Sequence, residues 1–378
     1  MPLQYIVGKC QRFVSIHVVL LLIIALNSRP VSALLGFEDH AFPEFITSSR
    51  ALSMGNAFIC KTDDPWAVFY NPAGLGTVRG VSIHPGNLHL ETNKGFFNVS
   101  EGQAEDISKK ISKNFSAEKL NQNLRERPDN MVHTRANLFP NITGRYFSLG
   151  YLYSKRVRAA YDSETSVYEF AEREDHGPLA GLNVSLFGGV LKFGASGVYL
   201  RRKQLQKDFT STDPVTVEDS EYKRGEAFIG TVGGRLTLPF VFLPTFAAVL
   251  RNSGAVYFHR VEQEQDPPER IEQTLDLGFS LTPQIGQRSR IHLEVNLRDV
   301  HNRYQTEVKR RLGGGMEFDV SRTFFLRLGY GDGFGSGGIG IRTKKVLLDL
   351  TTYAVDNTAS SYRGEEDRRF VFSISTGI

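Results

Sequence analysis

Charged and titratable residues recur at alternate positions in the last third of the chain, most of them next to apolar residues. The set comprises Glu272, Asp276, His292, Glu294, Arg298, Lys309, Arg311, Glu317 and Arg327. Because alternate side chains of a strand share one face, such residues gather together. There they could form a ladder of ion pairs, bind the carboxylate of a solute by charge-assisted hydrogen bonds, or supply an acid–base pair. The candidates for contacting a ligand are His292, Glu294, Arg298, Arg311 and Arg327.

Sequence patterns of known catalytic and cofactor sites are absent. The chain has no His-Glu-x-x-His, no Gly-x-Ser-x-Gly and no Gly-Lys-Ser/Thr. Its net charge is +4, without a Lys/Arg-rich stripe that would indicate a nucleic-acid partner. The sequence therefore predicts no enzyme, no metal and no cofactor.

The elements that must position the charged set are strands. From Ile291 to Arg298, aliphatic residues occupy one parity, and His292, Glu294, Asn296 and Arg298 occupy the other. The segment from Ile271 to Leu281 repeats this pattern. A charge facing lipid near the bilayer midplane costs about 2–4 kcal/mol, so the aliphatic face should point to lipid and the charged face into a hydrated lumen.

This alternation persists over most of the last 240 residues or so and predicts an all-β fold, a transmembrane antiparallel β-barrel. The alternative is a soluble β-sandwich or soluble barrel, in which the apolar face would point inward. We count 13 to 16 strands between Val81 and Ile378. Since bacterial single-chain barrels usually have an even number of strands, we expect about 14.

The connections divide into two kinds. Tight turns are expected at Gly188-Gly189, at 319–322 and at Lys344-Lys345, and these belong on the periplasmic side. Long polar connections at 92–131, 205–220, 262–269 and 356–367 are expected to be extracellular loops.

The first long loop, 92–131, contains a candidate helix. Ile107, Ile111 and Phe115 recur at a helical spacing, and Pro128 ends the pattern. The helix could be a lid or a docking element, or it could simply fold onto the rim of the barrel.

The N-terminus carries an export signal. Lys9 and Arg12 precede an apolar run from Val14 to Leu26, and Val31-Ser32-Ala33 is a small-x-small cleavage pattern. We expect residues 1–33 to be removed as a signal peptide, after which Cys60 is the one cysteine left. The domains are then a hatch or plug segment at 34–80 and a barrel at 81–378.

The segment 34–80 is rich in small residues and does not alternate like a strand. Its core is Arg-Ala-Leu-Ser-Met-Gly-Asn-Ala-Phe at 50–58, followed by Asp-Asp-Pro-Trp-Ala-Val-Phe-Tyr-Asn-Pro-Ala-Gly-Leu at 63–75. The motif residues are Arg50, Gly55, Asp63, Asp64, Asn71, Pro72, Ala73 and Gly74. This pattern resembles the N-terminal signature of the FadL/TodX superfamily of outer-membrane transport barrels, and most closely its PorV/PorQ-type branch.

The resemblance implies a protein of the bacterial outer membrane, in contact with its lipid, whose N-terminal hatch plugs the lumen. On the FadL side it implies passive uptake of a hydrophobic or amphipathic small-molecule ligand, such as a fatty acid. On the PorV side it implies a non-transporting docking or shuttle protein with a secretion-system partner protein. The polar composition of the 92–131 loop departs from the apolar capture groove of the FadL side, and both roles stay open.

Overall fold

The computed structural model describes residues 45–100, 116–128, 130–210, 214–261, 266–343, 345–356 and 366–377. The expected signal peptide, residues 1–33, and the expected helix around Ile107, Ile111 and Phe115 lie outside the described residues.

The strands are β1 (Ser82–His84), β2 (Gly86–Asn93), β3 (Met131–Leu138), β4 (Asn141–Thr143), β5 (Phe147–Asp162), β6 (Val167–Leu186), β7 (Leu191–Phe209), β8 (Lys223–Thr237), β9 (Thr245–Arg251), β10 (His259–Arg260), β11 (Thr274–Leu281), β12 (Ser289–Leu297), β13 (Leu312–Val320), β14 (Phe324–Gly331), β15 (Phe334–Arg342), β16 (Val346–Asp356) and β17 (Glu366–Thr376). The helices are α2 (Ser49–Ser53), α3 (Ala67–Tyr70), η1 (Pro72–Thr77), α4 (Lys94–Ser100), α6 (Ala117–Glu126), η2 (Phe187–Gly189), η3 (Asp219–Glu221) and α7 (Val308–Arg311).

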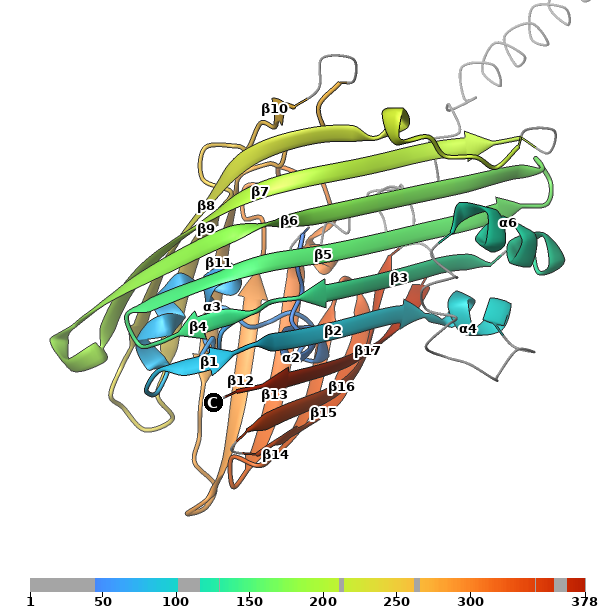
Figure 1. The fold of residues 1–378 in the computed structure, drawn as a ribbon. Helices are drawn as coiled ribbons and strands as arrows, with labels where there is room; N and C mark the ends of the chain where they lie inside the picture. Colours follow the sequence, from blue (N-terminus) through green and yellow to red (C-terminus); the bar gives the residue numbers. More distant parts are fainter. Residues whose placement is uncertain are drawn as a thin grey trace, which may run out of the picture. The chain divides into compact units, whose positions relative to one another are not determined.

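The strands form one antiparallel sheet that closes on itself, because β17 pairs with β2 (Figure 1). The described residues contain 17 strand segments. Proline-containing breaks divide two wall strands into the pairs β1/β2 and β3/β4, and β10 is a two-residue extension beside β8. The wall therefore has 14 strands, which confirms the predicted barrel. Closure leaves no strand edge unpaired, as a sheet in lipid requires.

The two faces of the wall differ as the alternation predicts. On β12, Leu293 is 41% exposed and Val295 52%, whereas the interleaved Glu294 is 2% exposed. On β14, Leu326 is likewise exposed and Arg327 is fully buried. The aliphatic residues thus form an outward belt and the charged residues face the interior. None of the helices in the described ranges is long and apolar enough to cross a membrane.

The two ends of the barrel are unlike. At the tight-turn end, short turns such as Phe187–Val190 join the strands, and β1 begins and β17 ends there. At the long-loop end, β5 to β8 extend well beyond their neighbours: β6 has 20 residues and β14 has 8 (Figure 1). Helix α6 packs Leu120 and Leu124 against Tyr168 and Phe170 of this extension. Those two aromatic residues share the face of exposed Leu182, so α6 covers the outer surface.

Three sequence-based boundaries need correction. β7 continues to Phe209, so the connection expected at 205–220 is 210–222. The connection expected at 262–269 is longer, because β9 ends at Arg251 and β11 begins at Thr274. Lys309 and Arg311 were expected on a strand, but 308–311 is a helical turn. The reason is pairing: β12 ends at Leu297, which pairs with Leu312, so residues before Leu312 have no partner strand.

The N-terminal segment, residues 45–78, lies inside the barrel. Its short helices α2 and α3 are buried on all sides, and η1 contacts β6, β7 and β8. Across the lumen from β6 to β8, glycines allow the backbone of the N-terminal segment to come close to the backbone of β14. Gly55 has φ +60°, and a Cβ added to Gly329 of β14 would lie 2.1 Å from the Gly55 nitrogen. Only glycine permits backbone contact of this kind at both positions.

Candidate functional site

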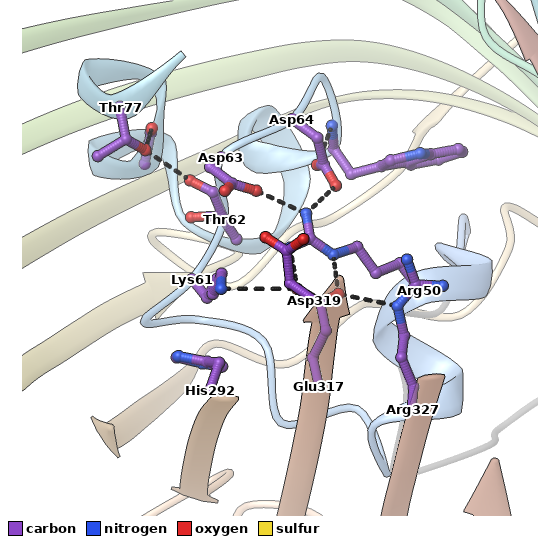
Figure 2. Close-up of polar contacts among 12 residues, drawn as sticks. Arg50, Lys61, Thr62, Asp63, Asp64, Thr77, His292, Glu317, Asp319 and Arg327 are labelled. Atoms are coloured by element: carbon purple, nitrogen blue, oxygen red, sulfur yellow. Dashed lines mark hydrogen bonds and ion pairs between the residues drawn. The ribbon is translucent and has the colours of Figure 1, made fainter. Parts of the chain in front are cut away.

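Arg50 lies at the centre of a buried ion-pair network that joins the N-terminal segment to the wall (Figure 2). Helix α2 carries it into the lumen, where its Nε and Nη2 donate to the two carboxylate oxygens of Glu317 on β13, both at 2.7 Å. Its Nη1 donates to Asp63 at 2.5 Å and to Asp64 at 3.1 Å. One guanidinium therefore binds the acidic pair of its own segment and a carboxylate of the barrel.

The wall completes the network. Arg327 of β14 donates through Nε to Glu317 at 2.8 Å and through Nη1 to Asp349 at 2.6 Å, and Lys61 lies 3.5 Å from Glu317. Cross-strand register explains the contact, since Glu317 and Arg327 are directly paired. Burial alone would raise the pKa of Asp63, but the positive charge of Arg50 holds that pKa well below its usual range. The network is thus a charged anchor in which removing one member leaves others uncompensated.

The Asn71-Pro72-Ala73-Gly74 motif forms a second contact with the wall. Asn71 is buried, its Nδ2 donates to the Ile59 carbonyl at 2.8 Å, and its Oδ1 accepts from the Ala73 nitrogen at 3.0 Å. Asn183 of β6 donates to the Ala73 carbonyl at 3.0 Å. A Cβ at Gly233 of β8 would lie 2.0 Å from Asn71 Oδ1, so the motif rests directly on the wall.

The opposite part of the lumen is apolar. A single buried cluster joins three sources: the N-terminal segment, the inner face of β5 to β8 with Phe139, and the β9–β11 connection. Its members are Phe45, Ile46, Ala51, Met54, Phe58, Trp66, Val68, Phe69, Tyr70, Phe139, Leu152, Leu179, Val198, Leu200, Ala227, Ile229, Val256, Phe258 and Ile271. Ile271 was expected to face lipid; it is 1% exposed because β11 begins only at Thr274. An apolar side chain can therefore be buried along this part of the interior.

His292 and Glu294 of β12 lie together on the lumen side. His292 Nε2 is 2.9 Å from Glu294 Oε2, and its Nδ1 is 2.9 Å from the Thr282 hydroxyl. Glu294 also accepts from the Cys60 backbone nitrogen at 2.8 Å. Besides contacting each other, His292 and Glu294 therefore attach the N-terminal segment to β12 through Glu294. The Cys60 thiol is buried and takes part in no disulfide.

Arg298 is buried, and Asp276 of β11 and Tyr70 of the N-terminal segment act on it electrostatically, so it faces the lumen as the alternation predicts, whereas Arg311 does not. Arg298 follows the end of β12 and its backbone nitrogen donates to the Arg311 carbonyl at 3.0 Å. Arg311 ends α7 at the long-loop end, and its Nη1 donates to the Asp299 carbonyl at 2.9 Å. Arg311 is therefore not a side chain of a lumen-facing strand, and Lys309 is largely exposed beside Glu307.

A second buried network was not predicted. Glu91 of β2 accepts from Tyr353 at 2.8 Å, lies 2.6 Å from His133 Nε2, and is flanked by Arg369 at 3.6 Å. Arg135, on β3, donates to Thr47 of the N-terminal segment at 3.0 Å. The signal was available, because Asn87, His89 and Glu91 alternate with the apolar Leu88 and Leu90 as the β12 residues do.

A cavity of about 920 Å³ opens at the tight-turn end, and the Arg50 network forms part of its lining. Cationic side chains predominate on its lining: Arg50, Lys61, Arg79, Arg145, Lys192, Arg235, Arg290, Arg322, Arg342 and Lys345. The acidic side chains on it are Asp63, Asp64, Glu317 and Asp319. The cavity is therefore positively charged and contacts both the N-terminal segment and the turns.

Comparison with known proteins supports the fold. The Pseudomonas putida toluene transporter TodX superposes with a TM-score of 0.50 at 9% identity, covering 89% of this chain and 98% of that one. The CymD monoaromatic hydrocarbon channel gives a TM-score of 0.50 at 10% identity, covering 87% and 96%. A Pseudomonas aeruginosa FadL homologue gives 0.45 at 10% identity, covering 89% and 99%.

No protein-family model matches the chain, and no curated protein matches it in sequence. The likeness to solved structures covers nearly the whole barrel of each neighbour. Together with the closed sheet and its outward apolar belt, it makes this chain a 14-stranded outer-membrane β-barrel whose fold is that of TodX and CymD.

Proposed function

We propose that this protein admits hydrophobic or amphipathic small molecules through the outer membrane, with residues 34–80 as the hatch that closes the lumen. The solute enters from the long-loop end, moves along the apolar part of the lumen, and leaves when the hatch shifts. In this proposal uptake is passive, and the solute moves down its own concentration gradient.

The observation that carries the proposal is the apolar cluster inside a barrel wall. It runs from Phe258 and Val256 in the β9–β11 connection to Trp66 and Phe69 beside the hatch motif. A lumen that conducts water-soluble solutes is polar throughout. Burial of a hydrocarbon chain against these side chains would stabilise it by about 0.8 kcal/mol per methylene, whereas a hydrated pore offers it nothing.

The hatch proposal adds a mechanism for closure. The Arg50 network and the Asn71 motif attach the segment to opposite parts of the wall, β13–β14 and β6–β8. Opening needs only some of these contacts to break, because the segment is not part of the sheet. A hydrophobic solute that displaces Trp66 or Phe69 would weaken the apolar side of this attachment first.

The test is uptake of labelled long-chain fatty acid and of toluene by cells that express this protein and lack their own barrel for these solutes. Ser49 Oγ of α2 and Thr351 Oγ1 of β16 are 2.9 Å apart, so paired cysteines there can bridge hatch and wall. We expect the Ser49→Cys/Thr351→Cys variant to lose uptake when oxidised and regain it on reduction, with Ser49→Cys alone as the control. Absence of uptake by the unmodified protein refutes the function; uptake unchanged by the bridge refutes only the moving hatch.

A docking role like that of the PorV branch is the second candidate, and one observation favours it. The networks around Glu317 and Glu91 would make the hatch a rigid filler of the lumen. Under that role the cells take up neither solute, whether the bridge is oxidised or reduced. The protein should instead co-purify with a secretion-system partner protein after cross-linking in intact cells, and the oxidised bridge should not change that.

A further inference from the structure

Two cations lie directly opposite each other on the inner wall of the tight-turn cavity. Lys192 of β7 and Arg235 of β8 are register partners, and both line the cavity. Like charges directly opposite on paired strands repel each other. Lys192 is 6% exposed, so water screens this repulsion poorly.

The surrounding groups do not neutralise the pair. Within the described parts of the chain, Lys192 Nζ donates only to the Gly189 carbonyl, and Arg235 Nη1 donates to the Thr77 hydroxyl at 3.4 Å. The buried Arg235 Nε has no hydrogen-bond partner there. The nearest carboxylates are engaged elsewhere, Asp63 by Arg50 and Glu294 by His292.

A third cation completes the arrangement. Arg145, in the turn before β5, lines the same cavity and lies close enough to Lys192 to interact with it electrostatically, and it forms no ion pair with a described residue. Three cations that line one cavity, one of them with an unused guanidinium donor, suit an oxyanion with several acceptor atoms.

We propose that Lys192, Arg235 and Arg145 form a binding site for a carboxylate or phosphate group at the tight-turn end of the lumen. The oxyanion accepts from Lys192 Nζ and Arg235 Nε, and Arg145 covers it from the mouth of the cavity. Arg235 also contacts Thr77 at the end of the hatch. An anion bound at this site would therefore affect how the hatch is attached to the wall. The site is separate from uptake: it binds its anion in purified protein whether or not the barrel transports a solute.

Trp66 provides the readout, because it is the chain's one tryptophan and lines this cavity. The purified protein in a neutral detergent is titrated with dodecyl phosphate, dodecanoate, inorganic phosphate and, as the uncharged control, dodecanol. Dodecanol can still bind to the apolar part of the lumen, so the anion site is judged by affinity: we expect saturable fluorescence changes with the first two at concentrations at least tenfold lower than dodecanol requires. Saturable binding of inorganic phosphate with similar affinity assigns the site to a free anion; much weaker binding assigns it to the head group of an amphipathic molecule.

Variants separate the site from general charge. Lys192→Met/Arg235→Gln should weaken dodecyl phosphate binding at least tenfold, and Arg145→Gln several-fold. Arg201→Gln, on the same strand but exposed and paired with Glu226, should not change it. Unchanged affinity in both cavity variants, or equal affinity for dodecanol, overturns the proposal.

Thermal unfolding gives a second measurement that does not depend on Trp66. Phosphate or dodecyl phosphate should raise the melting temperature of the unmodified protein and of Arg201→Gln, but not that of Lys192→Met/Arg235→Gln. The exposed Arg145→Gln change retains the fold and carries the test if the double variant fails to fold. An equal rise in all variants shows that the anion acts elsewhere and also overturns the proposal.

Discussion

Replacing Arg50 with methionine should release the hatch while leaving the barrel closed. Arg50 makes four charge-assisted hydrogen bonds, two to Glu317 and one each to Asp63 and Asp64. Breaking a buried ion pair from one side costs about 3–5 kcal/mol because an uncompensated charge remains. Glu317 keeps Arg327 at 2.8 Å, and the Asp63 side chain is 35% exposed, so water can reach it. We therefore expect the lower end, about 3 kcal/mol.

The loss should be local, because no strand pairing involves residues 45–78. A change of about 3 kcal/mol raises the open population of the hatch by roughly two orders of magnitude. Hydrogen exchange, followed by mass spectrometry in nanodiscs, should show faster exchange in peptides from 45–78 and unchanged exchange in β12 to β14. Ion conductance in planar bilayers should rise in parallel.

Two further variants and the pH dependence sharpen this prediction. Arg50→Lys should slow the exchange of residues 45–78 relative to Arg50→Met, because it restores a positive charge. The recovery should be partial, since an ammonium cannot bind Glu317 in bidentate fashion. Arg368→Gln removes an exposed pair with Glu366 and should change little. In the unmodified protein Arg50 keeps the pKa of Asp63 below its unfolded value of about 4, so that contribution is complete from pH 5 to 7 and falls only at lower pH.

In Arg50→Met the buried Asp64, whose pKa burial already raises, lacks its cation and should protonate more readily as the pH falls, which lessens the penalty. Exchange of residues 45–78 that stays as slow in Arg50→Met as in the unmodified protein at pH 7 would refute the anchor. So would acceleration of the same size in β12 to β14, because that would indicate loss of the whole fold.

Three further changes test the packing and the register. Gly329→Ala should destabilise hatch attachment by about 1–3 kcal/mol, because its Cβ would meet the Gly55 nitrogen; Gly314→Ala, with open space around it, is the control, and exchange rates of 45–78 report the difference. Asn71→Ala removes two buried hydrogen bonds and should cost about 1–3 kcal/mol, measured by urea-induced exchange of the same segment. Leu326→Arg should lower the folding free energy in liposomes by about 2–4 kcal/mol; no loss relative to Leu326→Ala would contradict the lipid-facing assignment.

The barrel was predictable because lipid imposes one rule on every strand. An exposed Leu293 and a buried Glu294 follow from alternation alone, and closure follows because an open edge is not tolerated in lipid. The rule fails where pairing ends. Residues 308–311 alternate like a strand, but their would-be partner β12 has already stopped at Leu297, and only the register reveals this.

The positions of the charged residues on paired strands were likewise predictable, but their partners were not. Alternation places Glu317 and Arg327 in the lumen, yet the pair depends on the offset between β13 and β14, and the link to Arg50 depends on how a segment outside the sheet folds into the interior. The same limit hid the repulsive pair of Lys192 and Arg235. They are 43 residues apart in the sequence (235 − 192), and only the β7–β8 register places them face to face. Each network therefore tests the register as well as the chemistry: a one-residue slip of β8 against β7 would turn Arg235 toward lipid and remove the proposed anion site together with the seat of Asn71 on Gly233.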